Sequence, residues 1–134
     1  MNPIEILLVE DNSGDVRLSI EAFKGSNLIH HINVVQDGVE AIAFLRQVER
    51  YFDAPRPHVI LLDLNLPRKN GMEVLDEIKS DNGLKDIPVV IFTSSDNDVD
   101  VLLAYKKQAN AYLVKPASLS QFDLVIKAVE ELCN

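Results

Sequence analysis

Polar residues that could take part in chemistry directly follow short apolar stretches of the chain. Glu10 and Asp11 follow the first stretch, Asp63 the third, Thr93 the fourth and Lys115 the fifth. If the stretches are parallel strands, their carboxyl ends meet at one edge of a sheet, where open α/β folds bind ligands. Taken singly, each residue has an ordinary explanation, such as a helix cap, a turn or a surface charge. Their joint occurrence at four strand ends favours a functional site.

Three carboxylates, one hydroxyl and one ammonium group indicate phosphate chemistry. Carboxylates brought together without a cation repel one another, and one of them would be expected to hold a proton. A hard divalent cation such as Mg²⁺ removes this repulsion, because it prefers carboxylate and phosphate oxygens. With the metal and Lys115 neutralising its oxygens, a phosphoryl group could be attacked by a carboxylate to give an aspartyl phosphate. The Thr93 hydroxyl could donate to a phosphoryl oxygen.

Five short apolar runs must position these groups. Most are unbroken rather than alternating, and they are rich in Val, Ile and Leu. Such runs are typical of strands that are buried on both faces of a parallel sheet. The predicted strands are 6–9, 32–35, 59–62, 89–92 and 111–114.

Apolar residues at helical spacing fill the segments between these runs. Val16, Ile20 and Phe23, for example, are spaced by four and three residues. Strand and helix alternate five times, which predicts an α/β fold that is doubly wound around a parallel sheet. Segment 49–58 contains two prolines and is the least regular part of the chain, so it is predicted to be a loop.

Length and charge limit the classes of protein. A chain of 134 residues suits one domain. Its 13 Lys and Arg against 21 Asp and Glu residues give a net charge of −8, which argues against nucleic-acid and anionic-membrane binding. The single cysteine, Cys133, cannot form an internal disulfide, and the N-terminus lacks a signal-peptide pattern. Apolar runs such as 101–105 are far shorter than the roughly 20 residues of a membrane span. We therefore expect a soluble, cytoplasmic domain.

The chain resembles, over essentially its whole length, the receiver domain of two-component response regulators. The resemblance rests on Glu10 and Asp11, on Asp63 with Pro67 and Gly71 at fixed offsets, on Thr93, and on Lys115 with Pro116. It implies a flavodoxin-like (βα)5 fold whose five parallel strands lie in the order 2-1-3-4-5. It also implies that residues 1–134 form a single receiver domain without an output domain. Such a domain is not an enzyme beyond its own phosphoryl transfer and autodephosphorylation.

The resemblance implies that Asp63 is the phosphoacceptor, phosphorylated by a histidine kinase in a phosphorelay. It implies that Glu10, Asp11 and Asp63 bind Mg²⁺ together with the backbone carbonyl of Asn65.

Further residues would act once Asp63 is phosphorylated. The resemblance makes Thr93 the switch hydroxyl and Lys115 the lysine that contacts the phosphoryl group. It makes the bond between Lys115 and Pro116 a cis peptide, which proline permits at low cost. Tyr112 matches the aromatic residue that swings inward when Thr93 moves; the alternative is an ordinary half-buried aromatic residue of the strand.

The long 49–58 segment and the sequence from Asp63 to Gly71 resemble those of stand-alone regulators that work with bacterial phytochrome kinases. The expected partners are a sensor histidine kinase, of phytochrome type in this comparison, and a downstream protein. Val99, Leu102 and Tyr105 give the fourth predicted helix more apolar surface than one face needs. That helix, the fifth strand and the fifth helix could form a homodimer face. A deeply packed fourth helix explains the same residues.

Other classes of protein fit the sequence less well. A hydrolase of the haloacid-dehalogenase kind needs a second Asp two residues after the nucleophile, where this chain has Asn65. A nucleotide-binding module needs a glycine-rich turn, whereas the turn after the first strand carries Glu10 and Asp11. A degenerate receiver that acts only as a structural interaction module remains the alternative, and the retention of Asp63, Thr93 and Lys115 argues against it.

Overall fold

The computed structural model of the protein describes residues 2–115, 119 and 122–133. One sheet contains the strands β1 (Ile4–Val9), β2 (His30–Val35), β3 (Val59–Leu62), β4 (Val89–Thr93) and β5 (Ala111–Val114). The helices are α1 (Ser13–Lys24), α2 (Gly38–Arg46), α3 (Gly71–Ser80), α4 (Asp98–Lys106) and α5 (Asp123–Leu132). None of the helices described is both long and apolar enough to cross a membrane.

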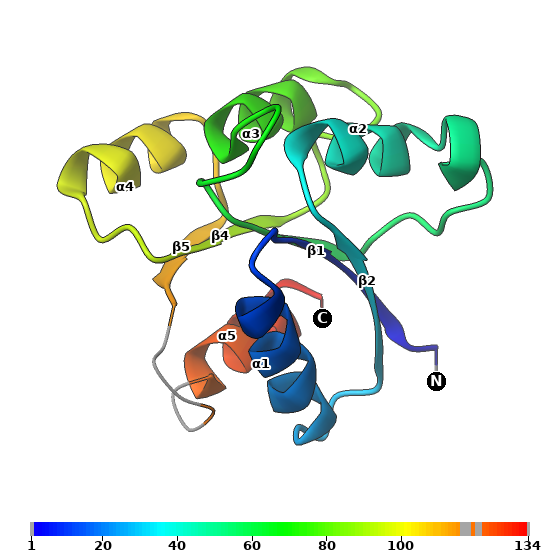
Figure 1. Cartoon of the computed structure of the whole chain (residues 1–134). Helices are drawn as coiled ribbons and strands as arrows, with labels where there is room; N and C mark the ends of the chain where they lie inside the picture. The colour runs from blue at the N-terminus through cyan, green and yellow to red at the C-terminus, as the bar shows by residue number, and fades with distance from the viewer. Residues whose placement is uncertain (1, 116–118, 120–121, 134) are drawn as a thin grey trace.

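The five strands are parallel and lie in the order β2-β1-β3-β4-β5. Helices α1 and α5 cover one face of the sheet, and α2, α3 and α4 cover the other (Figure 1). This is the doubly wound, flavodoxin-like arrangement that the alternating pattern and the resemblance predicted. Each predicted strand is present, and only the ends differ by one or two residues.

The apolar runs are unbroken because the sheet carries a core on each face. In β1, Leu7 and Val9 pack among the residues of α2 and α3, whereas Ile6 and Leu8 pack among those of α1 and α5. Successive side chains of a strand point to opposite faces, so a strand with a core on both sides must be apolar at every position. The edge strands depart from this rule, and Val114 of β5 is 49% exposed.

Segment 49–58 was predicted to be a loop, and most of it is irregular. It contains one short 3-10 turn, η1 (Glu49–Tyr51). The ring of Tyr51 lies 5.4 Å from that of Phe44 in α2, and the Arg50 guanidinium lies 4.9 Å from the Tyr51 ring centre. The segment is therefore folded against α2 on the side of the sheet edge formed by β2.

Helix α4 is not deeply packed. The sequence allowed a deeply packed fourth helix as one explanation of its apolar residues, and that explanation is wrong. Ala104 is its one buried side chain. Val99 and Leu102 are 69% and 71% exposed, and Tyr105 is also exposed. The helix therefore rests on the sheet through a narrow contact and presents apolar side chains to the outside.

Two glycines, Gly38 and Gly71, lie very close to the loop that connects β3 to α3. This loop begins with Asp63. A Cβ atom added to Gly71 would lie 2.2 Å from the backbone oxygen of Asp63, and one added to Gly38 would lie 2.0 Å from that of Lys69. The Gly71 N–H donates to the Leu64 carbonyl at 2.9 Å. The first turns of α2 and α3 thus approach this loop at distances that only glycine permits.

We expect Gly71→Ala to lower the free energy of unfolding by about 1–3 kcal/mol, the usual cost of forcing extra atoms into a packed site. Urea unfolding followed by circular dichroism measures the change. Gly25→Ala is the matched control, because its new Cβ would lie 3.6 Å from the nearest backbone oxygen, an ordinary contact. A Gly71→Ala protein as stable as the control would contradict the close approach.

Candidate functional site

Strand register places Glu10 and Asp63 side by side. Val9 of β1 is the partner of Leu62 in β3, so the next residue of each strand emerges at the same carboxyl edge. The Glu10 N–H donates to the Val35 carbonyl at 2.9 Å, and the Asp63 N–H donates to the Val9 carbonyl at 3.1 Å. Both residues are buried. The sheet therefore fixes the backbone of both acids before their side chains make any contact.

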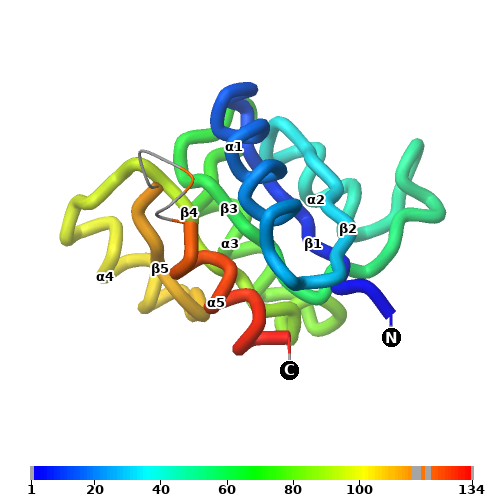
Figure 2. The backbone as a smooth tube through the Cα atoms, turned by 90° about the horizontal axis from the view of Figure 1, so that it is seen from below, coloured from blue at the N-terminus to red at the C-terminus, as the bar shows by residue number. Residues whose placement is uncertain are grey.

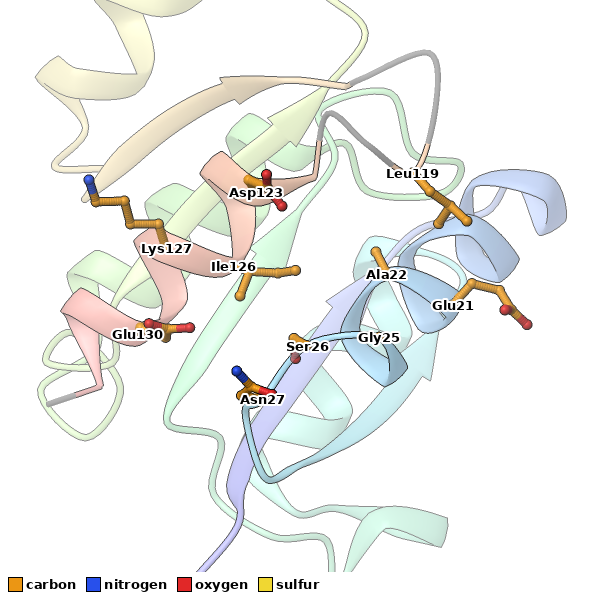
Figure 3. A pocket seen from close by; sticks show the side chains of 10 residues that line it. All are labelled: Glu21, Ala22, Gly25, Ser26, Asn27, Leu119, Asp123, Ile126, Lys127 and Glu130. Carbon is orange, nitrogen blue, oxygen red and sulfur yellow. The ribbon is translucent and has the colours of Figure 1, made fainter.

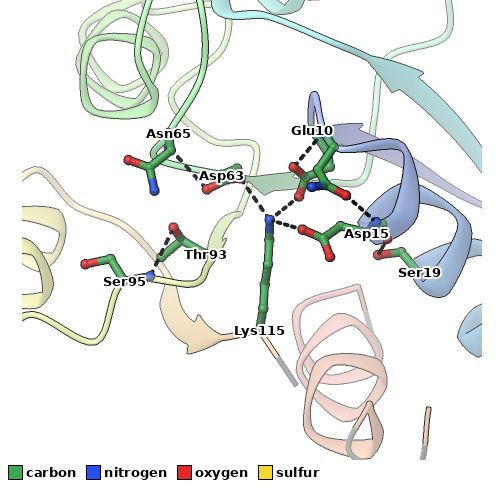
Figure 4. Close-up of polar contacts among 9 residues, drawn as sticks. Glu10, Asp15, Ser19, Asp63, Asn65, Thr93, Ser95 and Lys115 are labelled. Atoms are coloured by element: carbon green, nitrogen blue, oxygen red, sulfur yellow. Dashed lines mark hydrogen bonds and ion pairs between the residues drawn. The ribbon is translucent and has the colours of Figure 1, made fainter. Parts of the chain in front are cut away.

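The ammonium group of Lys115 lies among three carboxylates (Figure 4). Its Nζ atom is 2.5 Å from Oε1 of Glu10, 2.9 Å from Oδ2 of Asp63 and 2.8 Å from Oδ2 of Asp15. An ammonium group has three N–H donors, so these three acceptors engage all of them. Lys115 is well covered, with 11% of its side chain exposed. It therefore reaches inward from the end of β5 as the balancing cation of the edge.

The two buried acids differ in their proton affinity. Burial, assisted by the charge of Asp63, raises the pKa of Glu10 to about 7 even though Lys115 acts in the opposite direction. Burial also acts to raise the pKa of Asp63, but hydrogen bonds from Lys115, Thr93 and Asn65 outweigh it and hold that pKa below its usual value. Asp63 is therefore the carboxylate that stays ionised at neutral pH.

Lys115 stays protonated in the same surroundings. Burial acts to lower the pKa of its ammonium group, but hydrogen bonds to Asp15, Glu10 and Asp63 raise it above the ordinary value. A charged ammonium group thus faces an ionised Asp63. This is the arrangement needed to hold an anionic group beside a nucleophilic carboxylate.

The predicted metal ligands come together. Glu10, Asp11 and Asp63 each offer a carboxylate oxygen, and these oxygens lie within 4.8 Å of one another. Asp11 is exposed, which leaves the group open to solvent. Asn65 is exposed as well, and its backbone N–H donates to Oδ1 of Asp63 at 3.2 Å. An all-oxygen set of this kind fits a hard divalent cation.

Thr93 and Tyr112 are linked through Ser95. Thr93 is fully buried at the end of β4, and its Oγ1 accepts the Ser95 N–H at 3.5 Å. The half-buried Tyr112 donates its hydroxyl to the Ser95 carbonyl at 2.8 Å. Ser95 also donates its own hydroxyl to Asp100 of α4 at 2.7 Å. The loop from β4 to α4 is therefore connected to the acidic edge, to β5 and to α4.

The structure gathers Glu10, Asp11, Asp63, Thr93 and Lys115 at one edge, as the strand ends predicted. The bond between Lys115 and Pro116, predicted to be cis, lies outside the described residues.

Sequence reasoning missed Asp15. The available signal was an acid in the first turn of the helix that follows the acidic pair, but such an acid is usually explained as a favourable charge at a helix start.

A groove between α1 and α5 is separate from this edge (Figure 3). Glu21 of α1 and Ile126 and Lys127 of α5 contribute to its walls. None of the predicted site residues lines it. The groove is therefore no part of the acidic edge.

We expect Lys115→Met to destabilise the metal-free protein. Breaking a buried ion pair costs roughly 3–5 kcal/mol. Because Asp11 leaves this edge open to water, a loss of about 2 kcal/mol in the free energy of unfolding is expected. Mg²⁺ should stabilise the variant more than the unsubstituted protein, because the metal replaces the missing positive charge. Urea unfolding with and without Mg²⁺ measures both effects.

Lys107→Met is the matched control, since it removes a lysine whose Nζ contacts the exposed Asp76 at 2.6 Å. Surface pairs of this kind contribute about 0–1 kcal/mol. If the Lys115 variant were as stable as this control and gained nothing from Mg²⁺, the three carboxylates would not depend on the ammonium group.

Comparison with known proteins identifies the family of this chain. The family model of the response regulator receiver domain matches residues 6–127. The chain is 46% identical over 128 residues to response regulator Rcp1 of Synechocystis sp., covering 96% of this chain and 87% of Rcp1. The crystal structure of the phosphorylated cyanobacterial phytochrome response regulator RcpA is 49% identical, with a TM-score of 0.88 and coverage of 97% of this chain and 93% of RcpA.

A second solved structure, the Mn²⁺-bound form of Rcp1, is 44% identical with a TM-score of 0.83, covering 98% of this chain and 90% of that one. The match spans both halves of the sheet and all the strand ends that carry the acidic edge. The chain therefore belongs to the response regulator receiver domain family of two-component signalling proteins.

Proposed function

We propose that this receiver accepts a phosphoryl group on Asp63 in a Mg²⁺-dependent reaction and signals by changing its contacts with other proteins. The observation that carries the proposal is the state of Asp63. It is the buried acid with a lowered pKa, it touches Lys115, and it belongs to the group of oxygens that suits a metal. Nucleophile, balancing cation and metal ligands thus converge on one carboxylate.

This geometry supports the following transfer step. An oxygen of Asp63 forms a bond to phosphorus while the bond from phosphorus to the donor's imidazole nitrogen breaks. The broken bond's electron pair stays on that nitrogen, which takes up a proton. Lys115 and the Thr93 hydroxyl would donate to the phosphoryl oxygens. Mg²⁺ held by Glu10, Asp11, Asp63 and the Asn65 carbonyl would supply further neutralising charge.

The relatives support a choice of kinase. RcpA is a cyanobacterial phytochrome response regulator. We propose that the donor for this chain is likewise a sensor histidine kinase of phytochrome type, acting in the cytoplasm. Receivers act as phosphoacceptors, and we propose no reaction for this one beyond its own phosphorylation and autodephosphorylation. The net charge of −8 supports a protein rather than nucleic acid or a membrane as the next partner.

The output surface that we propose is α4 with β5 and α5, and its occupant is a second copy of the chain. Val99 and Leu102 of α4 and Val114 of β5 are exposed apolar side chains. The first turn of α4 is acidic, and its last turn is basic. Two copies related by a twofold axis perpendicular to α4 would place the acidic end of one α4 beside the basic end of the other.

The link from Asp63 to this surface is the chain of contacts through Ser95. We propose that Thr93 moves toward the phosphoryl group and that Tyr112 then turns inward, as the family resemblance implies. Tyr112 now donates to the carbonyl of Ser95, so a movement of that loop would release or redirect its ring. Figure 2 shows α4, β5 and α5 following one another along one side of the molecule.

Incubation with a small phosphodonor and Mg²⁺ should add the mass of one phosphoryl group to the intact protein. Asp63→Asn should show no gain, because an amide is not a nucleophile here, and chelation of the metal should slow the reaction at least tenfold. Asp53→Asn is the control, since Asp53 is an exposed residue of segment 49–58, outside the acidic edge. Intact mass spectrometry measures each case.

Two outcomes would contradict this assignment. A gain of phosphoryl mass by the Asp63→Asn variant would place the acceptor elsewhere. No gain by the unsubstituted protein would favour the alternative, a degenerate receiver that serves as a structural interaction module.

Sedimentation should show a shift from monomer to dimer when Asp63 is phosphorylated. Leu102→Glu should keep the phosphorylated protein monomeric, because it places a charge in the apolar contact. Phe52→Glu is the control, since Phe52 is 75% exposed but lies in segment 49–58. Analytical ultracentrifugation measures the mass in solution. A monomer under both conditions would rule out the second copy as the occupant.

A further inference from the structure

Asp15 contacts Lys115, and the phosphoryl-transfer step described above gives it no role. It lies in the first turn of α1, one turn beyond the acidic pair, and its Oδ2 is 2.8 Å from the Lys115 Nζ. The two residues are 100 positions apart in the sequence. The contact joins α1 to the end of β5 at the carboxyl edge of the sheet (Figure 4).

The backbone around Asp15 is held from both sides. Its N–H donates to the side chain of Asn12 at 2.9 Å. Its carbonyl accepts from the hydroxyl of Ser19 at 2.9 Å, and Ser19 is 1% exposed. Asn12 in turn donates its own N–H to Oε2 of Glu10 at 3.2 Å. The carboxylate of Asp15 therefore starts from a fixed backbone rather than from a free turn.

Asp15 differs from the other two acids that hold Lys115. Glu10 and Asp63 both belong to the group of oxygens that could bind a metal, whereas Asp15 does not. A cation that takes oxygens from Glu10 and Asp63 would weaken their hold on the ammonium group. Asp15 would keep its contact, because no metal competes for it. Of the three acceptors, it is the one that can serve Lys115 throughout the reaction.

We propose that Asp15 is a positioning residue that anchors the Lys115 ammonium group from α1 and keeps it pointed at the phosphoryl group on Asp63. The proposal rests on the proposed function of Asp63. It differs from the ordinary explanation, in which Asp15 only stabilises the start of α1. That explanation predicts an effect on stability that does not depend on Lys115.

A double-mutant cycle separates the two explanations. With a small phosphodonor and Mg²⁺, Asp15→Asn should lower the rate of Asp63 phosphorylation by about tenfold, the lower range for partners that orient a functional side chain. In a Lys115→Met background the same substitution should change the rate by less than about twofold. Asp15→Glu keeps the carboxylate and should recover part of the rate.

Glu21→Gln is the matched control, because it removes one negative charge from the same helix without contacting Lys115. It should leave the phosphorylation rate unchanged. An equal loss of rate from Asp15→Asn with and without Lys115 would overturn the proposal, and so would a rate equal to that of the control.

A second readout does not need phosphorylation. In proton–nitrogen NMR spectra, the ammonium group of Lys115 should give a signal protected from exchange in both the metal-free and the Mg²⁺-bound protein. The Asp15→Asn variant should lose that protection when Mg²⁺ is added, while the Glu21→Gln variant should keep it. Protection that survives in the Mg²⁺-bound Asp15→Asn protein would overturn the anchor. Because this spectrum is independent of phosphoryl transfer, failure of the proposed function would be seen separately, as an absence of phosphoryl mass.

Discussion

The structure depends on one electrostatic constraint, which is that several carboxylates share the carboxyl edge of the sheet with one ammonium group. Burial raises the pKa of Glu10, so this edge is costly to charge without a cation. Lys115 offsets the cost by donating to Glu10, Asp15 and Asp63. The balance is incomplete, because one ammonium group faces three carboxylates and the carboxylate of Asp11 lies beside those of Glu10 and Asp63. The remaining demand for positive charge is what makes the edge a site for a divalent metal.

The fold supplies the geometry that this balance needs. Glu10 and Asp63 emerge side by side because Val9 and Leu62 are partners in the sheet. Gly71 then allows α3 to begin against the backbone of Asp63. This close contact fixes the loop that leads from Asp63 to α3. The order of the strands places β3 at the centre of the sheet and β1 beside it, so Glu10 and Asp63 emerge from interior strands that are paired on both sides. If Asp63 is the phosphoacceptor, as proposed, a carboxylate held this way loses little freedom when it reacts.

Sequence reasoning could predict the parts of this arrangement that the backbone determines. Unbroken apolar runs located every strand, and the residues after them located Glu10, Asp63, Thr93 and Lys115. The contact of Asp15 was not predictable, because it depends on the angle at which α1 leaves β1 rather than on any spacing. The exposure of Leu102 was not predictable either, since an apolar residue at helical spacing has the same pattern whether it faces the sheet or a partner.

The site and the exposed face of α4 are joined by a short polar path rather than by the apolar core. Thr93, Ser95 and Tyr112 are connected through one loop, and Ser95 also holds Asp100 at the start of α4. α4 has a narrow buried contact, with Ala104 as its one buried side chain. An element so lightly attached can shift when a few hydrogen bonds change, whereas a deeply packed helix would have to break its core to do so. Under the proposed function, the loose packing of α4 and its apolar surface serve the same end, because a helix that shifts on phosphorylation transmits a signal only if a partner binds the surface that it carries.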